Sequence, residues 1–396
     1  MLVHSVCRRA RREGLGRNEV YDLLIAGGTV VDPASGLHAP RDVAVQHGQI
    51  AAVAPAIDAE RARQVVDAAG LVVTPGLVDL HTHLFWGVSH YGVEPDSACL
   101  ARGVTTAVDA GSAGAQTFPG FRRYVIDVVS TRVLAFENIS VIGMITNRVG
   151  ELEDIRYADP EAAVAIAEQH RDVVVGVKVR LGYQMVGERA LPALLLARAA
   201  AERLALPLMV HIIDLPEPLA EMLALLRPGD IVTHCFHGEK NGVLNQAGRV
   251  LPAVRDAVAH GILLDVGHGV GSFSFAVARR ALADGVLPDT ISSDLHAHNI
   301  HGPVFDLATT LSKFLYLGLS LDEVVARATV TPARAIGWDG RIGTLAPGAM
   351  ADIALFQLAE GRFALTDAAQ ETVQATQALL PRGVMRAGRL IQTTKG

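Results

Sequence analysis

Two histidines separated by one residue are the first feature of this sequence that could do chemistry. His81 and His83 end an apolar, β-branched stretch that starts at residue 71 and contains the pair Pro75-Gly76. Such a stretch predicts a buried strand. Side chains two apart on a strand project to the same side, with Cα atoms roughly 6.5 Å apart, so the two imidazoles could bind one metal ion. By itself the pair is weak, because two ordinary histidines also occur at this spacing by chance.

Four further residues of metal-ligand type lie at or near the ends of other predicted strands. They are Lys178, His211, His234 and Asp294. Taken singly, each has an ordinary alternative: Lys178 could be a solvated edge lysine, His234 a packed core histidine, and Asp294 the cap of a following helix. Six such residues at the same end of one fold are improbable as coincidence, which favours a shared metal site.

The central part of the chain must supply the elements that position these residues. Strand-like and helix-like stretches alternate there, which indicates βαβ units and a parallel sheet. The predicted strands are 71–80, 104–108, 133–136, 173–179, 206–210, 230–233, 261–266 and 290–293. The predicted helices are 161–169, 190–205, 216–227, 250–259, 275–284, 304–316 and 321–336. Eight strands at this spacing predict a (β/α)8 TIM barrel, whose active site lies at the C-terminal ends of the strands.

The two ends of the chain have a different pattern, made of short strands and turns. Residues 21–33 read as two strands around the Gly27-Gly28 turn, and 42–45 and 48–53 continue the pattern; strands are also predicted at 351–356 and 384–391. Neither end is long enough for a core of its own, so we expect them to pair. The predicted organisation is a disordered extension over 1–18, a small β-sandwich domain formed from 19–72 and 340–396, and a barrel domain over 73–339.

The ligand types favour a catalytic metal centre. Imidazoles and carboxylates suit zinc, and also manganese, cobalt or iron, and a site without a thiolate cluster is typical of catalysis. Lys178 is unusual among them, because a protonated ammonium would repel metal ions. Burial and neighbouring cations lower the pKa of a lysine, and a neutral amine can take up carbon dioxide to form a carbamate that bridges two ions.

These residues carry a resemblance to a known family. The order of HxH, Lys, His, His and Asp, with the run 22–32, the block TPGLVDLHTH at 74–83 and GTLAPGAMAD at 343–352, resembles the amidohydrolase superfamily. The likeness is to its members with two metals and a carboxylated lysine, in the dihydroorotase-like branch. Bacterial amidohydrolase/deacetylase proteins are nearer still.

The resemblance implies a ligand scheme and a mechanism. His81, His83 and Asp294 would hold one divalent ion, zinc being the first choice, and His211 and His234 the other. Carboxylated Lys178 and a hydroxide would bridge the two ions. The hydroxide would attack an amide or ester carbonyl, and Asp294 would act as the catalytic proton carrier.

Substrate contacts are predicted on either side of these ligands. Dihydroorotases have an arginine two residues after HxH, but this chain has Phe85 there, which argues against dihydroorotate and favours an apolar substrate portion. Arg180 and Tyr183, just after Lys178, could bind a carboxylate. We therefore predict deacylation of an N- or O-acylated small carboxylic acid. The alternatives are a cyclic-amide hydrolase of dihydroorotase or hydantoinase type and a non-catalytic scaffold barrel.

Composition restricts the other partners. A net charge of −6 gives no footprint for nucleic acid, and no run of 18 apolar residues predicts a membrane helix. Three scattered cysteines make no disulfide framework, so a reducing, cytoplasmic location is expected. A small-molecule substrate is the expected partner, and homo-oligomerisation stays open.

Overall fold

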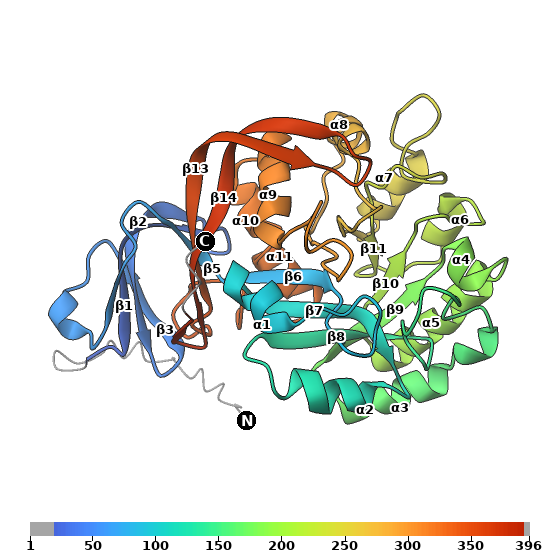
Figure 1. Cartoon of the computed structure of the whole chain (residues 1–396), viewed down its shortest axis with the longest axis horizontal. Coiled ribbons are helices and arrows are strands. Elements are labelled where there is room, and N and C mark those ends of the chain that lie inside the picture. Colours follow the sequence, from blue (N-terminus) through green and yellow to red (C-terminus); the bar gives the residue numbers. More distant parts are fainter. Residues whose placement is uncertain (1–19, 392–396) are drawn as a thin grey trace, which may run out of the picture.

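The computed structural model describes residues 20–391 and contains two sheets (Figure 1). The extension expected at 1–18 lies outside the described residues. One sheet is parallel and belongs to a TIM-like barrel in the centre of the chain. The other sheet is mixed and combines strands from both ends of the chain, as the sequence predicts. The proposed domain limits at 72/73 and 339/340 remain a prediction.

Seven strands of the barrel are hydrogen-bonded in chain order. Their residues are almost all buried, as expected for a parallel sheet that is covered on both faces. The strands are β6 (Leu77–Thr82), β7 (Val104–Gly114), β8 (Arg132–Asn138), β9 (Val174–Arg180), β10 (Leu208–His211), β11 (Ile231–Thr233) and β12 (Leu263–Leu264).

The predicted eighth strand is present only as a closing segment, residues 290–295. Isolated parallel bridges join Thr290 to Asp265, beyond β12, and Leu295 to Thr82 on β6. The segment does not form a regular ladder because the amide of Ser293 donates to the Asp79 side chain at 2.9 Å. The prediction of a strand at 290–293 is therefore corrected, although the barrel still closes there.

The predicted helices are present with different ends. They are α3 (Pro160–Gln169), α5 (Ala190–Leu204), α6 (Leu219–Leu223), α7 (Pro252–Ala259), α8 (Phe275–Ala283), α9 (Leu307–Tyr316), α10 (Leu321–Ala326) and α11 (Val330–Ala335). Prolines at 216, 218 and 228 confine α6 to five residues. The expected single helix 321–336 is two helices, because the chain leaves helical geometry at Thr329. Short helices α1 (Pro95–Ala98), α2 (Phe118–Phe121) and α4 (Tyr183–Val186) were not predicted.

The terminal strands form one mixed eight-stranded sheet. Its order is β15-β14-β13-β5-β1-β2-β3, with β4 paired to β1. The N-terminal strands are β1 (Leu23–Asp32), β2 (Leu37–Gln46), β3 (Gln49–Ala54), β4 (Val65–Asp67) and β5 (Val72–Pro75). The expected pair of strands within 21–33 is a single strand with a bulge, since Gly27 adopts a φ of 79°. The predicted strand 71–80 divides at Gly76, where a Cβ atom would lie 2.2 Å from Thr105 Oγ1.

A long hairpin joins the terminal sheet to the barrel. Strands β13 (Ile353–Thr366) and β14 (Thr372–Arg386) extend well beyond the predicted 351–356 and 384–391, and β15 (Arg389–Ile391) follows. The hairpin runs over α9 toward α8 (Figure 1). Its turn residue Asp367 accepts a hydrogen bond from the Phe275 amide at 2.7 Å, and Leu379 N donates to Ser312 Oγ at 2.9 Å. The C-terminal strands therefore hold the last helices of the barrel in place.

Within residues 20–391, none of the helices has the length and apolar character needed to cross a bilayer. The bulk of the buried apolar side chains forms one core that surrounds the barrel strands, and a smaller core lies within the terminal sheet.

A buried carboxyl on β8 gives a testable pH dependence of stability. Among the described residues, neither side-chain oxygen of Glu137 has a hydrogen-bond partner, and burial raises the pKa of Glu137 from 4.5 to about 9. The folded state thus keeps a proton that the unfolded state releases above pH 4.5. Its contribution to the free energy of unfolding is complete below pH 4.5 and falls as pH rises toward 9, by up to about 1.4 kcal/mol per pH unit.

We expect Glu137→Gln to unfold at higher urea concentration than the parent at pH 8.5, and the gain to shrink at pH 6. Urea midpoints of both proteins at the two pH values measure this difference. Parallel pH profiles would contradict the assignment.

Candidate active site

The six predicted ligand residues meet at the C-terminal end of the barrel. His81 lies on β6, His83 directly after it, and Lys178 on β9. The other three, His211, His234 and Asp294, lie at the end of β10, after β11 and in the closing segment. Each element carries its residue to the same mouth because the strands are parallel.

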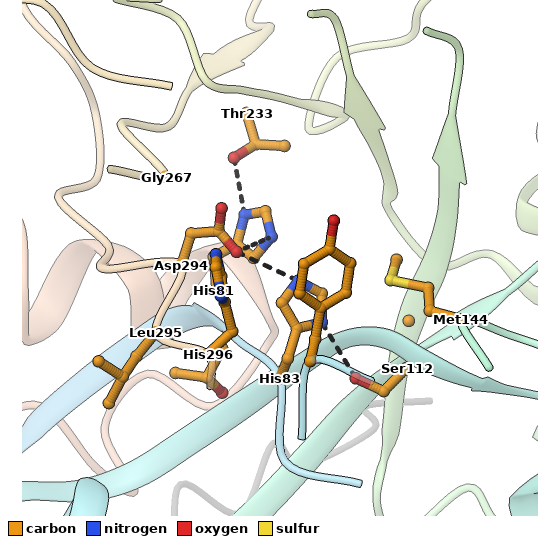
Figure 2. Close-up of polar contacts among 12 residues, drawn as sticks. His81, His83, Ser112, Met144, Thr233, Gly267, Asp294, Leu295 and His296 are labelled. Atoms are coloured by element: carbon orange, nitrogen blue, oxygen red, sulfur yellow. Dashed lines mark hydrogen bonds and ion pairs between the residues drawn. The ribbon is translucent and has the colours of Figure 1, made fainter. Parts of the chain in front are cut away.

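The side chains of this cluster are in close contact, and Figure 2 shows three of them, His81, His83 and Asp294. Ring centroids are 5.4 Å apart for His81 and His83, 5.0 Å for His81 and His234, and 4.4 Å for His211 and His234. Lys178 Nζ lies 3.4 Å from His81 Nε2. The predicted set is thus brought together, while its role as a ligand set remains a proposal.

Asp294 is at the centre of the cluster. Its Oδ1 atom lies 3.1 Å from His83 Nε2 and 3.4 Å from His81 Nε2 (Figure 2). Ligand atoms of His81, His234 and Asp294 all lie within 4.8 Å of one another and form a buried triad able to hold a metal ion. Oδ1 of Asp294 is buried and accepts no hydrogen bond from the described residues, which fits an acceptor reserved for a cation.

The histidines are held so that one ring nitrogen faces this centre. Nδ1 of His234 donates to the Gly267 carbonyl at 2.7 Å, and Nδ1 of His83 contacts Ser112 Oγ at 3.0 Å. A neutral imidazole that donates through Nδ1 keeps a lone pair on Nε2. Such a nitrogen is the form that binds a metal ion, so the donor set fits a divalent cation.

Burial also adjusts the charges of the cluster. It lowers the pKa of all four ligand histidines well below 6.5, and the charge of Lys178 acts in the same direction on each. Burial lowers the pKa of Lys178 to about 7 and raises that of Asp294 to about 6. Metal binding requires neutral imidazoles, and carbamate formation requires a neutral amine, which a lysine with a pKa of about 7 readily provides near neutral pH.

Two residues of the cluster have left-handed backbone conformations. The φ angles are 67° for His234 and 49° for Asp294. Such angles cost residues other than glycine about 1–2 kcal/mol, and strain of this kind is common at functional sites. The turns allow both side chains to point into the barrel mouth directly after their strands.

A cavity of about 540 Å³ opens above the cluster. Part of its wall is apolar and comes from Met185, Ile213 and Val270. Exposed carboxylates of Asp214 and Glu239 also line it. The remaining lining residues are five of the six predicted ligands, all but Lys178, together with Tyr91, Arg180, Gly182, Gln184, Gly271, Ser272 and His296.

Arg180 lines the cavity but is already paired. Its guanidinium makes two hydrogen bonds to buried Glu151, at 2.6 and 2.7 Å, and lies 5.7 Å from the centre of the Tyr91 ring. Burial acts to lower the pKa of Arg180, but Glu151 and, to a smaller extent, Tyr91 raise it above its ordinary value. A substrate carboxylate would therefore meet a cation whose charge is largely offset.

The other two predicted substrate contacts do not line the cavity. The Phe85 ring is buried in the core, 4.9 Å from the Phe121 ring centroid. Tyr183 begins α4 and is half exposed, whereas its neighbours Gln184 and Met185 face the cavity. Helical geometry turns successive side chains away from one another, so sequence proximity to Lys178 did not predict which one reaches the site.

Several residues of the site were not found from the sequence. Tyr91 stacks on His83 with centroids 5.2 Å apart, and His296 lies 4.8 Å from Tyr91. Glu151 comes from the loop after β8. Tyr91 and Glu151 have no spacing relation to the predicted ligands, so only the folded loops reveal them, whereas His296 lies two residues after Asp294 in the sequence.

Comparison with known proteins shows the family. Residues 72–391 match the sequence model of the amidohydrolase family. The chain belongs to this family. It is a metal-dependent hydrolase, and the buried triad described above agrees with that chemistry.

Individual relatives are similar over most of the chain. A deacetylase of Agrobacterium fabrum is 38% identical over 336 residues, which cover 85% of this chain and 82% of the relative. A crystal structure of an adenine deaminase has a TM-score of 0.88 and 33% identity, and covers 94% of this chain and 100% of its own. A crystal structure of a dihydroorotase has a TM-score of 0.86 and 35% identity, with 94% and 98% covered. The three relatives are named for different activities.

A glycine beside Asp294 offers a test of the site. A Cβ atom at Gly269 would lie 2.5 Å from Asp294 Oδ2, and its φ is 55°. We expect Gly269→Ala to displace the carboxylate and to weaken zinc binding by tenfold or more, an effect of the size seen when groups around metal ligands change. Competition with a chromophoric chelator measures the affinity. Gly271→Ala is the matched control, since nothing lies within 4 Å of its added Cβ atom, and equal losses in both variants would contradict the placement.

Proposed function

We propose that this amidohydrolase removes an acyl group from an N- or O-acylated small carboxylic acid. The observation that supports it best is the buried cluster around Asp294, whose Oδ1 is held 3.1 Å from His83 and 3.4 Å from His81 with no hydrogen bond. The similarity to the deacetylase of Agrobacterium fabrum favours an acyl compound. A cavity of about 540 Å³ fits a small molecule.

The six residues would hold two divalent ions, with zinc as the first choice. In this proposal His81, His83 and Asp294 form one site, His211 and His234 the other, and carboxylated Lys178 joins them. Ions bound there would supply Lewis-acid chemistry, by lowering the pKa of water and by polarising the acyl carbonyl. The Nζ atom of Lys178, 3.4 Å from His81 Nε2, is suitably placed for a bridging group.

Asp294 is the proton carrier in the proposed reaction. Water adds to the acyl carbonyl carbon, the C–N or C–O bond breaks, and the products are a carboxylic acid and a free amine or alcohol. A proton leaves the water for the Asp294 carboxylate and then passes to the leaving nitrogen or oxygen. A pKa raised by burial to about 6 suits a group that must both accept and donate near neutral pH.

The cavity wall provides the proposed recognition of the substrate. Met185, Ile213 and Val270 form an apolar surface that would receive a hydrophobic side chain. Arg180 and Tyr91 stand together on the wall. Arg180 is the proposed anchor for the carboxylate. Because Glu151 already takes two of the guanidinium nitrogens, the Tyr91 hydroxyl would supply a further hydrogen bond to the same carboxylate.

Cyclic-amide hydrolysis is the second candidate. It is favoured by the likeness to the crystal structure of a dihydroorotase. The residue two positions after His83 does not support it, because that position holds Phe85 instead of an arginine, and the Phe85 ring is buried in the core. The scaffold alternative is disfavoured, since all six ligand positions are filled and belong to one cluster.

The metal proposal predicts close to two ions per chain. We expect Lys178→Ala to fold but to lose metal and most activity, and wild-type protein equilibrated with ¹³C-bicarbonate to show a carbamate carbon signal that this variant lacks. Elemental analysis and ¹³C NMR measure the two quantities. Lys313→Gln is the control, because burial lowers the pKa of Lys313 to about 7 as well, yet Lys313 contacts His268 and Pro303 rather than the cluster. One ion or none in metal-replete wild type would contradict the proposal.

The substrate proposal is tested with a panel of N-acetyl amino acids, O-acetyl hydroxy acids, their methyl esters and cyclic amides. We expect the acylated acids to be turned over fastest. Arg180→Met should raise KM for the acids more than for the methyl esters, since the guanidinium nitrogen that Glu151 does not take would bind a carboxylate more strongly than a neutral ester. Equal effects would remove Arg180 from substrate binding. Faster turnover of dihydroorotate than of every acylated acid would support the second candidate instead.

A further inference from the structure

We propose that Asp265, acting through the hydroxyl of Thr233, is a positioning residue that sets the tautomer of His81. Thr233 ends β11 and Asp265 follows β12, so both lie beside His81 in the barrel mouth. The inference rests on the proposed function only in so far as His81 serves there as a metal ligand. The tautomer itself is a property of the metal-free chain.

Asp265 accepts hydrogen bonds from three hydroxyl groups. It is fully buried. Its Oδ2 lies 2.7 Å from Thr233 Oγ1 and 2.8 Å from Ser292 Oγ, and its Oδ1 lies 2.6 Å from Thr290 Oγ1. The Ser292 oxygen also accepts from the amide of Gly267 at 3.0 Å, which leaves its proton for the carboxylate. All the hydroxyls around Asp265 can therefore donate toward it.

The direction of these bonds determines the state of His81. While Asp265 is ionised, its carboxylate offers only lone pairs, so the single hydroxyl proton of Thr233 points to Asp265. Thr233 Oγ1 then presents a lone pair to His81 Nδ1, 2.8 Å away (Figure 2). A hydrogen bond at this distance requires the proton on Nδ1 of the imidazole. His81 Nδ1 and Asp265 Oδ2 are themselves 3.8 Å apart, too far for a direct hydrogen bond, so the threonine hydroxyl is needed between them.

The consequence appears on the other side of the ring. With its one proton on Nδ1, neutral His81 carries a lone pair on Nε2. That atom faces Asp294 Oδ1 and Lys178 Nζ, each at 3.4 Å. The relay formed by the hydrogen bonds from His81 to Thr233 and from Thr233 to Asp265 thus keeps His81 in the form that can bind a cation. It also prevents the ring from turning. Groups with this role typically affect metal affinity or activity by 10- to 100-fold.

A purely structural role for Asp265 is the alternative. The same carboxylate ties the closing segment to the barrel through Thr290 and Ser292. Thr290 is the useful comparison because, like Thr233, it is fully buried and gives its hydroxyl to Asp265. Only Thr233 also contacts His81. Deleting the hydroxyl of Thr233 or of Thr290 disturbs the Asp265 carboxylate, but only the deletion at Thr233 removes the contact with His81.

The test compares Thr233→Val with Thr290→Val, and includes Thr233→Ser as a rescue. In metal-free protein with ¹⁵N-labelled histidine, we expect the wild-type His81 ring to show a protonated Nδ1 and an unprotonated Nε2. Thr233→Val should move the signals toward the other tautomer or a mixture, whereas Thr290→Val and Thr233→Ser should keep the wild-type pattern. Zinc affinity should fall 10- to 100-fold in Thr233→Val alone. Thermal unfolding of each variant reports the structural effect separately.

Two outcomes would overturn the inference. One is a wild-type His81 protonated on Nε2; the other is an equal change of tautomer and zinc affinity in Thr233→Val and Thr290→Val. Failure of the proposed function gives a different result. In that case His81→Ala would leave the zinc content unchanged, while the tautomer of His81 would still differ between wild type and Thr233→Val. In the double variant Thr233→Val/Asp265→Ala the tautomer of His81 should shift no further than in Thr233→Val, since the two residues act on the ring in series.

Discussion

A backbone hydrogen bond from Asp294 N to the His81 carbonyl, 2.7 Å long, joins the last segment of the barrel to its first strand. A second bond, from His83 N to the Leu295 carbonyl, lies beside it at 3.0 Å. These two bonds close the barrel, and they also put the Asp294 carboxylate against the two histidines. The hydrogen bonds that close the barrel therefore also assemble this cluster. Any displacement of the segment 290–295 would open the sheet and separate the ligands together.

The closure creates an electrostatic problem, because it brings together a buried lysine, three buried imidazoles, the partly buried His211 and a buried carboxylate. Burial disfavours charge on each group, and the shifts in pKa follow that rule for Lys178 and Asp294. Polar neighbours limit the cost. Hydroxyl and carbonyl groups, such as those of Thr233 and Gly267, take the Nδ1 side of the rings. The Nε2 atoms on the inner side keep their lone pairs, which a bound metal ion would accept.

The proposed recognition of the substrate uses a different part of the barrel. Arg180 emerges from β9, the strand of Lys178, but its charge is balanced by Glu151 from the loop after β8. A buried arginine–carboxylate pair gives fixed geometry more than net charge. The pair and the ring of Tyr91, which stacks on His83, form a rigid wall next to the ligand cluster. The proposed substrate wall therefore contacts the same histidine, His83, that the closure positions.

The amino-acid sequence by itself determined the chemistry and the general architecture. Spacing on strands predicted that His81 and His83 act together, and alternation of strands and helices predicted where Lys178, His211 and His234 would meet, because parallel strands end at one face. The pairing of the two chain ends in one β-unit was predicted because neither end is long enough for a core of its own. These conclusions depend on local periodicity and composition, which a sequence carries directly.

Tertiary structure alone decided the contacts between distant segments. Phe85 and Tyr183 are next to ligands in sequence, yet one faces the core and the other solvent. Glu151 and Tyr91 reach the site from loops without any spacing signal, and the hydrogen bonds that join His81, Thr233 and Asp265 link residues far apart in the sequence. Prolines around α6 and the Asp79 side chain beside the closing segment changed element lengths that periodicity had overestimated. The physical reason is that side-chain direction and partner choice are fixed by packing and by the hydrogen bonds available after the barrel has closed.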